Sequence, residues 1–405
     1  MFGNMTKEKT YSAVSWAMVG VLLFIVASAA VANAVDIRVD YPQHIGIASK
    51  INLDGLCHPG TFLREHFYPI WHVLTRMAMT TFGISGRTAA TAVTGGCVLG
   101  TWICAVVYFA RRFSGDKDLA LLLSILLMLA SPIYLPFFNR NLVIGQSHPN
   151  YLHNPTQLMV KVLAFPCFIL YARLMDKIGK DEHFRFDAFK IVGISALLLL
   201  ATLAKPSFIQ IFLPSVVLLS VFKAIKHGRI AMRPILAFAL SMCPSLFLML
   251  WQAWIAFMSQ GNGESGVEIA FLKLYRHYSP NCFVSVLLIS LFPLIMLVWA
   301  IVRRRLIAMH GLAWLTYATG WLEGAFLIEK GRRMWHGNFT WGYALAAFFI
   351  WFVALDSYAS LCTESQSNSN GRERLWFWIA TPILVLHIAS GVCYLWRLLI
   401  LNIWR

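Results

Sequence analysis

The first long polar segment, residues 35–86, holds the side chains best suited to acid–base chemistry. It opens with Asp36 and Asp40, two carboxylates four residues apart, and His44 follows after four more. A fixed carboxylate can take the proton of an attacking hydroxyl group. These three residues are therefore the candidate catalytic set. The alternative for Asp40 is a cap on a short helix that starts near Pro42, and Asp36 could serve only to orient a neighbour or cap the loop.

A second polar cluster lies before and within a long apolar run. Its candidate substrate-binding members are Arg140, His148, His153, Asn154 and Lys161. Asn154 is a good helix start, and the free backbone N–H groups of a helix N-terminus favour an anion. Lys161 lies about 9 Å deeper along that helix. An ionisable side chain at such depth usually faces a cavity or a partner, although a lysine can also snorkel to the interface.

Lys205 and Pro206 interrupt another apolar stretch and predict a turn between two helices. The amine would then lie near the depth of a lipid headgroup phosphate, or it could simply snorkel. The segment 329–343 is denser in polar groups. Its candidate substrate-binding residues are Glu329, Arg332, Arg333, His336 and Asn338, interleaved with Trp335 and Trp341. An arginine fork matches phosphate oxygens. An aromatic belt at the membrane interface explains part of this pattern, but not its cations.

Several other chemistries have no counterpart in the sequence. The chain has no Gly-rich loop ending in Lys-Ser/Thr, no H-E-x-x-H and no G-x-S-x-G. Its eight cysteines form no C-x-x-C pair, so neither a zinc site nor a disulfide framework is indicated. We assign no metal-ligating residues; a divalent cation stays possible, but the spacing of the acidic pair argues against an obligatory one. The missing nucleotide loop favours a lipid-linked substrate over a nucleotide-activated one.

The elements that carry these residues are predicted to be membrane helices. Of the 405 residues, 59% are hydrophobic and 13% are charged, which excludes a water-soluble globule. Apolar runs of about 20 residues, the length needed to span a bilayer, recur throughout. We expect a single all-α domain, residues 1–405, with about eleven spans: 12–34, 87–110, 118–138, 156–175, 189–204, 206–224, 234–258, 281–302, 309–328, 339–360 and 375–399. The first run is expected to be a retained helix rather than a cleaved signal peptide.

The basic residues set the orientation. The formal net charge is +16, but the lysines and arginines alternate with the spans, which indicates loop anchoring rather than nucleic-acid binding. With the N-terminus inside, 18 of the 34 basic residues fall on the cytoplasmic side. Eight of the twelve histidines then fall on the outer side. This asymmetry places the chemistry outside, whereas residues 363–374 are predicted to be a polar cytoplasmic linker.

The outer loops carry their own predicted elements. Tyr41–Lys50 is predicted to form a short helix, and residues 66–82 are predicted to lie along the membrane interface. Residues 259–280 could form a third interfacial helix or a solvated loop, and the pattern slightly favours the loop.

This layout resembles the GT-C superfamily of integral-membrane glycosyltransferases. The stretch from Asp40 to Ala48 is similar to the D-[FL]-x-x-[YH]-x-x-A pattern of its polyprenyl-phosphate-mannose-type branches. The likeness covers the first 90 residues well and the remainder only as a helix-rich pattern. It implies an inverting transferase in a bacterial inner membrane, with its active site facing the periplasm. Its partners would be a polyprenyl-phosphate-linked sugar, a glycan or glycolipid acceptor and the bilayer.

Two other classes remain open at this point. One is a polymerase or ligase of envelope polysaccharide assembly without the GT-C core, which would usually carry catalytic Arg and His in a large late loop. The other is a secondary transporter of an anionic substrate, which would usually show repeated halves and polar residues on both sides of the membrane.

Overall fold

The architecture was taken from a computed structural model. It describes residues 2–36, 40–113, 116–138, 147–178, 188–257, 266–367 and 371–400. The described chain is a helical bundle with one two-stranded sheet. The long helices are α1 (Phe2–Asp36), α5 (Gly86–Arg112), α6 (Lys117–Leu129), α7 (Pro155–Lys177), α8 (Ala188–Ala204), α9 (Ser207–His227), α10 (Arg229–Phe257), α12 (Cys282–Val302), α13 (Ala308–Phe326), α14 (Trp341–Ser367) and α15 (Gly371–Ile400).

Eight of the helices in the described ranges are long and apolar enough to cross a membrane, so the chain is a multi-pass membrane protein. They are α1, α5, α7, α9, α10, α12, α14 and α15. A helix also stands at each of the other three expected positions: α6 with 13 residues, α8 with 17 and α13 with 19. The prediction of an all-α membrane helical bundle is therefore confirmed.

Two predicted boundaries differ from the structure. The expected run 118–138 is helical only to Leu129, because Pro132 disfavours helical geometry in the residue before it. The chain then turns inward, and the Ser131 carbonyl accepts a hydrogen bond from His387 Nδ1 at 2.6 Å. The expected linker 363–374 is mostly helical, since α14 continues to Ser367 and α15 begins at Gly371.

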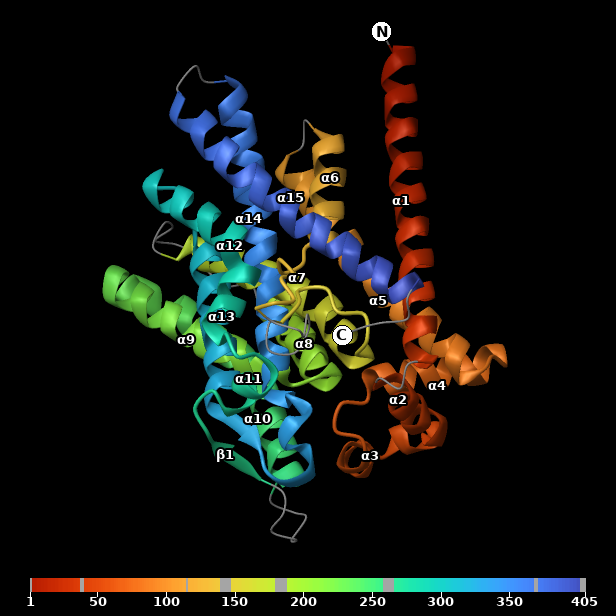
Figure 1. Cartoon of the computed structure of the whole chain (residues 1–405). Coiled ribbons are helices and arrows are strands. Elements are labelled where there is room, and N and C mark those ends of the chain that lie inside the picture. Colours follow the sequence, from red (N-terminus) through yellow and green to blue (C-terminus); the bar gives the residue numbers. More distant parts are fainter. Residues whose placement is uncertain are drawn as a thin grey trace.

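The shorter elements come from the outer loops of the sequence. They are α2 (Asp40–Lys50), η1 (Leu53–Cys57), α3 (Pro59–Glu65), α4 (Ile70–Phe82), β1 (Val267–Ile269), α11 (Lys273–Tyr278), β2 (Leu327–Glu329), η2 (Gly331–His336) and η3 (Asn338–Thr340). The two helices expected after the first span are therefore present, as α2 and α4. Figure 1 shows α2, α3, α4 and β1 at one end of the molecule, opposite the N-terminus of α1.

The described part of the segment 259–280, residues 266–280, combines a strand and a short helix. It forms β1, which pairs antiparallel with β2 in the register Val267↔Glu329, and then the short helix α11. The backbone of this segment is thereby tied to the chain that carries Glu329. The late polar segment is thus attached to the body of the protein on both sides.

The core is built around α14. About 89% of its apolar window is buried, against 22% for the corresponding window of α1. Small residues allow close approach of α13, because a Cβ added at Gly320 would lie 2.8 Å from the Tyr343 backbone. Close backbone contact through small residues is the usual way in which membrane helices pack. The start of α14 is therefore held in a fixed position.

We expect Gly320→Ala to lower stability by about 1–3 kcal/mol, because the added methyl group meets backbone rather than a flexible side chain. Gly311→Ala on the same helix is the control, since its Cβ would meet only the Leu219 side chain at 3.6 Å. Thermal unfolding of both variants in one detergent measures the difference. Equal midpoints for the two variants would contradict this account of the α13–α14 contact.

Candidate functional site

Asp40 is the first residue of α2, and the next residue fixes that helix in place. Tyr41 is fully buried, and its hydroxyl donates a 2.8 Å hydrogen bond to the Leu152 carbonyl. Its ring also meets Trp71 of α4 edge-on, with centroids 6.4 Å apart. Trp71 in turn donates from Nε1 to the Thr94 hydroxyl of α5 at 3.1 Å. The position of Asp40 is thus determined by three other elements.

Asn154 connects Asp40 to the start of α7. Its Oδ1 accepts from the Gln157 backbone N–H at 2.9 Å, which is the helix cap expected from the sequence. Its Nδ2 donates to Asp40 Oδ2 at 2.5 Å. Lys205 Nζ lies 3.4 Å from the same Oδ1. One carboxamide therefore holds a carboxylate at one end and an ammonium group at the other.

Lys205 stands between α8 and α9, as the Lys-Pro pair predicts. Only 8% of its surface is exposed, and Nζ lies 4.0 Å from the ring centroid of Trp341 at the start of α14. Burial lowers the pKa of Lys205 to about 7, although the charge of Asp40 opposes this shift. The amine is therefore close to its titration point at neutral pH.

Three histidines belong to the surroundings of this group. His153 precedes Asn154 and is 4% exposed; burial lowers its pKa to about 4, while Asp40 acts in the opposite direction. His44 lies one turn after Asp40 on α2, and its Nδ1 is 2.8 Å from His72 Nε2 of α4. Burial lowers the pKa of His44 to about 3 and that of His72 to about 4. Desolvation thus keeps the imidazoles neutral beside the Asp40–Lys205 pair.

Lys205 also lines a cavity of about 150 Å³. The other polar residues that line it are Tyr68, Ser207, Gln210, Gln252, Glu329, Arg333 and Asn338. Ser207 Oγ and Gln252 Oε1 are buried there without a hydrogen-bond partner among the described residues. Buried polar atoms are rarely left unpaired in proteins. We therefore infer that the cavity is shaped for a polar ligand.

The carboxylate and the cavity belong to one region of the protein. The pKa of Tyr68 is raised chiefly by burial, and it is affected by Asp40 as well as by Glu329 and Arg333. Glu329 is 7% exposed and accepts from Asn338 Nδ2 at 2.6 Å. Two basic residues, Lys205 from the α8–α9 turn and Arg333 from η2, therefore line the same cavity as the Glu329 carboxylate and the Asn338 amide. We call Asp40, His44, His153, Asn154, Lys205 and this cavity the polar site.

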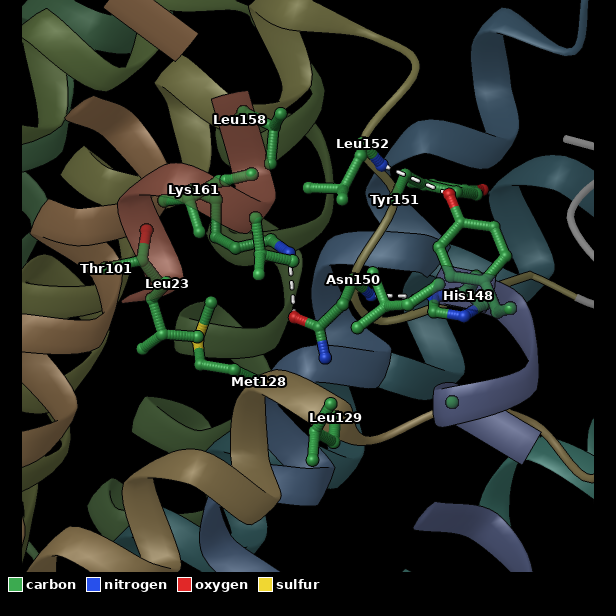
Figure 2. A pocket seen from close by; sticks show the side chains of 16 residues that line it. Leu23, Thr101, Met128, Leu129, His148, Asn150, Tyr151, Leu152, Leu158 and Lys161 are labelled. Carbon is green, nitrogen blue, oxygen red and sulfur yellow. Dashed lines mark hydrogen bonds between the residues drawn. The ribbon is translucent and has the colours of Figure 1, made fainter. Parts of the chain in front are cut away.

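Lys161 and His148 are not part of it. They line a separate, largely apolar cavity of about 50 Å³ (Figure 2). Lys161 Nζ donates to the Pro149 carbonyl at 2.5 Å and to Asn150 Oδ1 at 3.3 Å. Lys161 therefore does not share the cavity that Lys205 and Arg333 line. Lys161 is a buried cation satisfied by the loop before its own helix, which it fastens to α7.

His148 also has a structural role. Its Nδ1 accepts from the Asn150 backbone N–H at 2.9 Å, and its ring lies 4.4 Å from that of Tyr394. The remaining candidates are placed as follows. His336 is exposed and does not line the cavity. Asp36 is the last residue of α1, and its side chain lies outside the described part of the structure. Arg140 and the side chain of Arg332 also lie outside the described part.

Several residues of the polar site do not stand out in the sequence. His72, Tyr68, Ser207 and Gln252 all contribute polar atoms to it or to its cavity. Trp341, one of the aromatic residues of the segment 329–343, covers Lys205. The one available signal was Ser207, which follows the Lys-Pro break directly. Among the described residues, no group of three or more His, Cys, Asp or Glu side chains could hold a metal ion.

Comparison with known proteins adds no assignment. No protein-family model matches the chain, and no curated protein sequence matches it either.

We expect Tyr41→Phe to lower stability by about 1 kcal/mol, because it leaves the buried Leu152 carbonyl without its donor. Hydrogen-exchange protection of α2 should fall with it. Tyr358→Phe is a matched control, since it removes a 2.8 Å hydrogen bond to Thr381 on other helices. Exchange followed by mass spectrometry separates the two. Unchanged protection of residues 40–50 in Tyr41→Phe would show that this hydrogen bond does not hold α2.

Proposed function

We propose that the protein is an inverting membrane glycosyltransferase that takes its sugar from a polyprenyl-phosphate carrier. The observation that carries the proposal is the pairing, through Asn154, of the Asp40 carboxylate with the buried Lys205 ammonium at the edge of a polar cavity. A transfer of this kind needs a proton acceptor for the incoming hydroxyl group. It also needs fixed positive charge for the departing phosphate.

The residues divide between these two tasks. The acceptor hydroxyl oxygen bonds to the sugar C1 as its proton passes to Asp40, and the bond from C1 to the phosphate oxygen breaks. The developing charge on the phosphate is met by Lys205 and Arg333, which both line the cavity. Ser207 and Gln252 add polar atoms without partners among the described residues, which suit phosphate or sugar oxygens. A single displacement of this kind inverts the configuration at C1.

The membrane setting supports the same proposal. Asp40 and His44 of the polar site lie on α2, one of the elements that gather at one end of the molecule (Figure 1), and eight described helices are apolar enough to cross a membrane. We propose that this end faces the periplasm in a bacterial inner membrane, that all eleven long helices cross it, and that the fold is GT-C-like. The acceptor would be a glycan or glycolipid of the cell envelope.

Asp40→Asn should reduce sugar transfer by about 10²–10⁴-fold, because the amide keeps the size of the side chain but cannot take a proton. Asp54→Asn is the control: it is the same change in the same loop, on an exposed residue outside the polar site. Single-turnover transfer from a radiolabelled polyprenyl-phosphate sugar measures both variants. Near-normal transfer by Asp40→Asn would remove the general base, and wild-type uptake of an anion without transfer would favour a transporter.

The pH dependence should report Lys205. Because burial lowers its pKa to about 7, the fraction of charged amine falls as the pH rises through that value. The kcat/KM for the anionic donor should therefore decline above about pH 7, since this ratio reports the free enzyme. Lys205→Arg stays charged throughout this range. The alkaline decline should disappear in that variant, and a decline of the same midpoint in both proteins would exclude Lys205 as its source.

A further inference from the structure

The hydrogen bonds around His72 have a defined direction. His72 Nδ1 lies 3.3 Å from the carbonyl oxygen of Tyr68, four residues earlier in the chain. A carbonyl oxygen can only accept, so His72 carries its hydrogen on Nδ1. A neutral imidazole has one N–H group, and its second nitrogen is an acceptor. His72 Nε2 therefore presents a lone pair to His44.

His44 must then be the donor in the pair. Its Nδ1 is 2.8 Å from His72 Nε2, so the hydrogen lies on His44 Nδ1. The two rings are neutral at neutral pH, because burial lowers the pKa of both histidines. Positive charge on His72 or Lys205 lowers the pKa of His44 further. The second nitrogen of His44, Nε2, is left with a lone pair. The Tyr68 carbonyl thus determines the tautomer of both rings.

This lone pair is available to a ligand. Within the described part of the chain, no hydrogen bond joins His44 Nε2 to another residue. The ring is held edge-on to Trp71, with centroids 6.1 Å apart, and cannot turn freely. The nearby charges that act on it are Lys205 and Asp40. The nitrogen therefore belongs to the polar site, and it can accept a hydrogen bond but cannot donate one.

We propose that His44 Nε2 is a fixed acceptor for a sugar hydroxyl group, and that His72 is the positioning residue that sets its tautomer. This rests on the proposed transferase function and names the chemistry of one end of the site. A lone pair favours hydroxyl donors and repels phosphate oxygens, whereas Lys205 and Arg333 do the opposite. Lys205 and Arg333 line the cavity and His44 lies near Lys205, so the two sets of residues would orient a sugar phosphate across the polar site.

Two substitutions of His44 separate this role from a structural one. Gln places its terminal amide near the position of Nε2, whereas Asn places it near Nδ1. His44→Gln therefore retains an acceptor for the ligand, and His44→Asn retains the donor to His72. We expect the KM of the Asn variant to exceed that of the Gln variant by about 3- to 10-fold, the loss of one hydrogen bond, with similar kcat values. The reverse order would show that the pair only joins α2 to α4.

A second measurement needs no turnover. Nitrogen NMR of the purified full chain in lipid nanodiscs, at neutral pH, should show His44 protonated on Nδ1 and bare on Nε2. His72→Phe should release this tautomer, and His72→Gln should restore it, because the amide oxygen can accept where Nε2 did. The opposite tautomer in the wild type would overturn the proposal. If the tautomer is as expected but no sugar is transferred, the proposed function and the hydroxyl ligand both fail, whereas the hydrogen-bond direction stands.

Discussion

The carboxamide of Asn154 joins two charges that would otherwise be costly to keep in the interior of a membrane protein. It caps α7, donates a hydrogen bond to Asp40 and accepts a longer one, at 3.4 Å, from Lys205 Nζ. An ionised group removed from water needs hydrogen bonds or an opposite charge. The amide makes both contacts from one rigid helix terminus. The distance between the Asp40 carboxylate and the Lys205 amine is therefore set by the backbone of α7. The geometry of the polar site depends on this interaction.

The N-terminus of α7 is itself held by buried hydrogen bonds among residues outside the polar site. Lys161 binds the carbonyl of Pro149 and the side chain of Asn150, and the Asn150 amide donates to the end of α6. Gln157 donates to the Trp341 carbonyl at 3.0 Å, which connects α7 to the start of α14. The loop before α7 is thus fixed on both sides. A buried lysine within an apolar membrane helix, usually a sign of function, here stabilises the loop that supports the site.

The sequence predicts the helices well, because each apolar run must satisfy its own backbone in lipid. It also places Asp40, Asn154 and Lys205 among the candidate site residues, because their types suit acid–base chemistry and anion binding. It could not separate Lys205 from Lys161, because each is a single lysine in an apolar helix region. Their hydrogen-bond partners differ: Lys161 donates to the loop before its own helix, whereas Lys205 donates to Asn154, 51 positions away. The Asp40–Asn154 contact spans 114 positions, and no local pattern records it.

The composition of the cavity bears on the class of ligand. A site for a simple anion would gain from cations and N–H donors alone. Here Glu329 and Arg333 both line the cavity, and Asp40 and His44 lie near Lys205, which lines it too. Acceptors next to cations would weaken the binding of a bare anion, but they match a ligand that carries hydroxyl donors and a phosphate together. The mixture of groups, rather than the positive charge alone, is what favours a sugar phosphate over an inorganic anion and a transferase over a transporter.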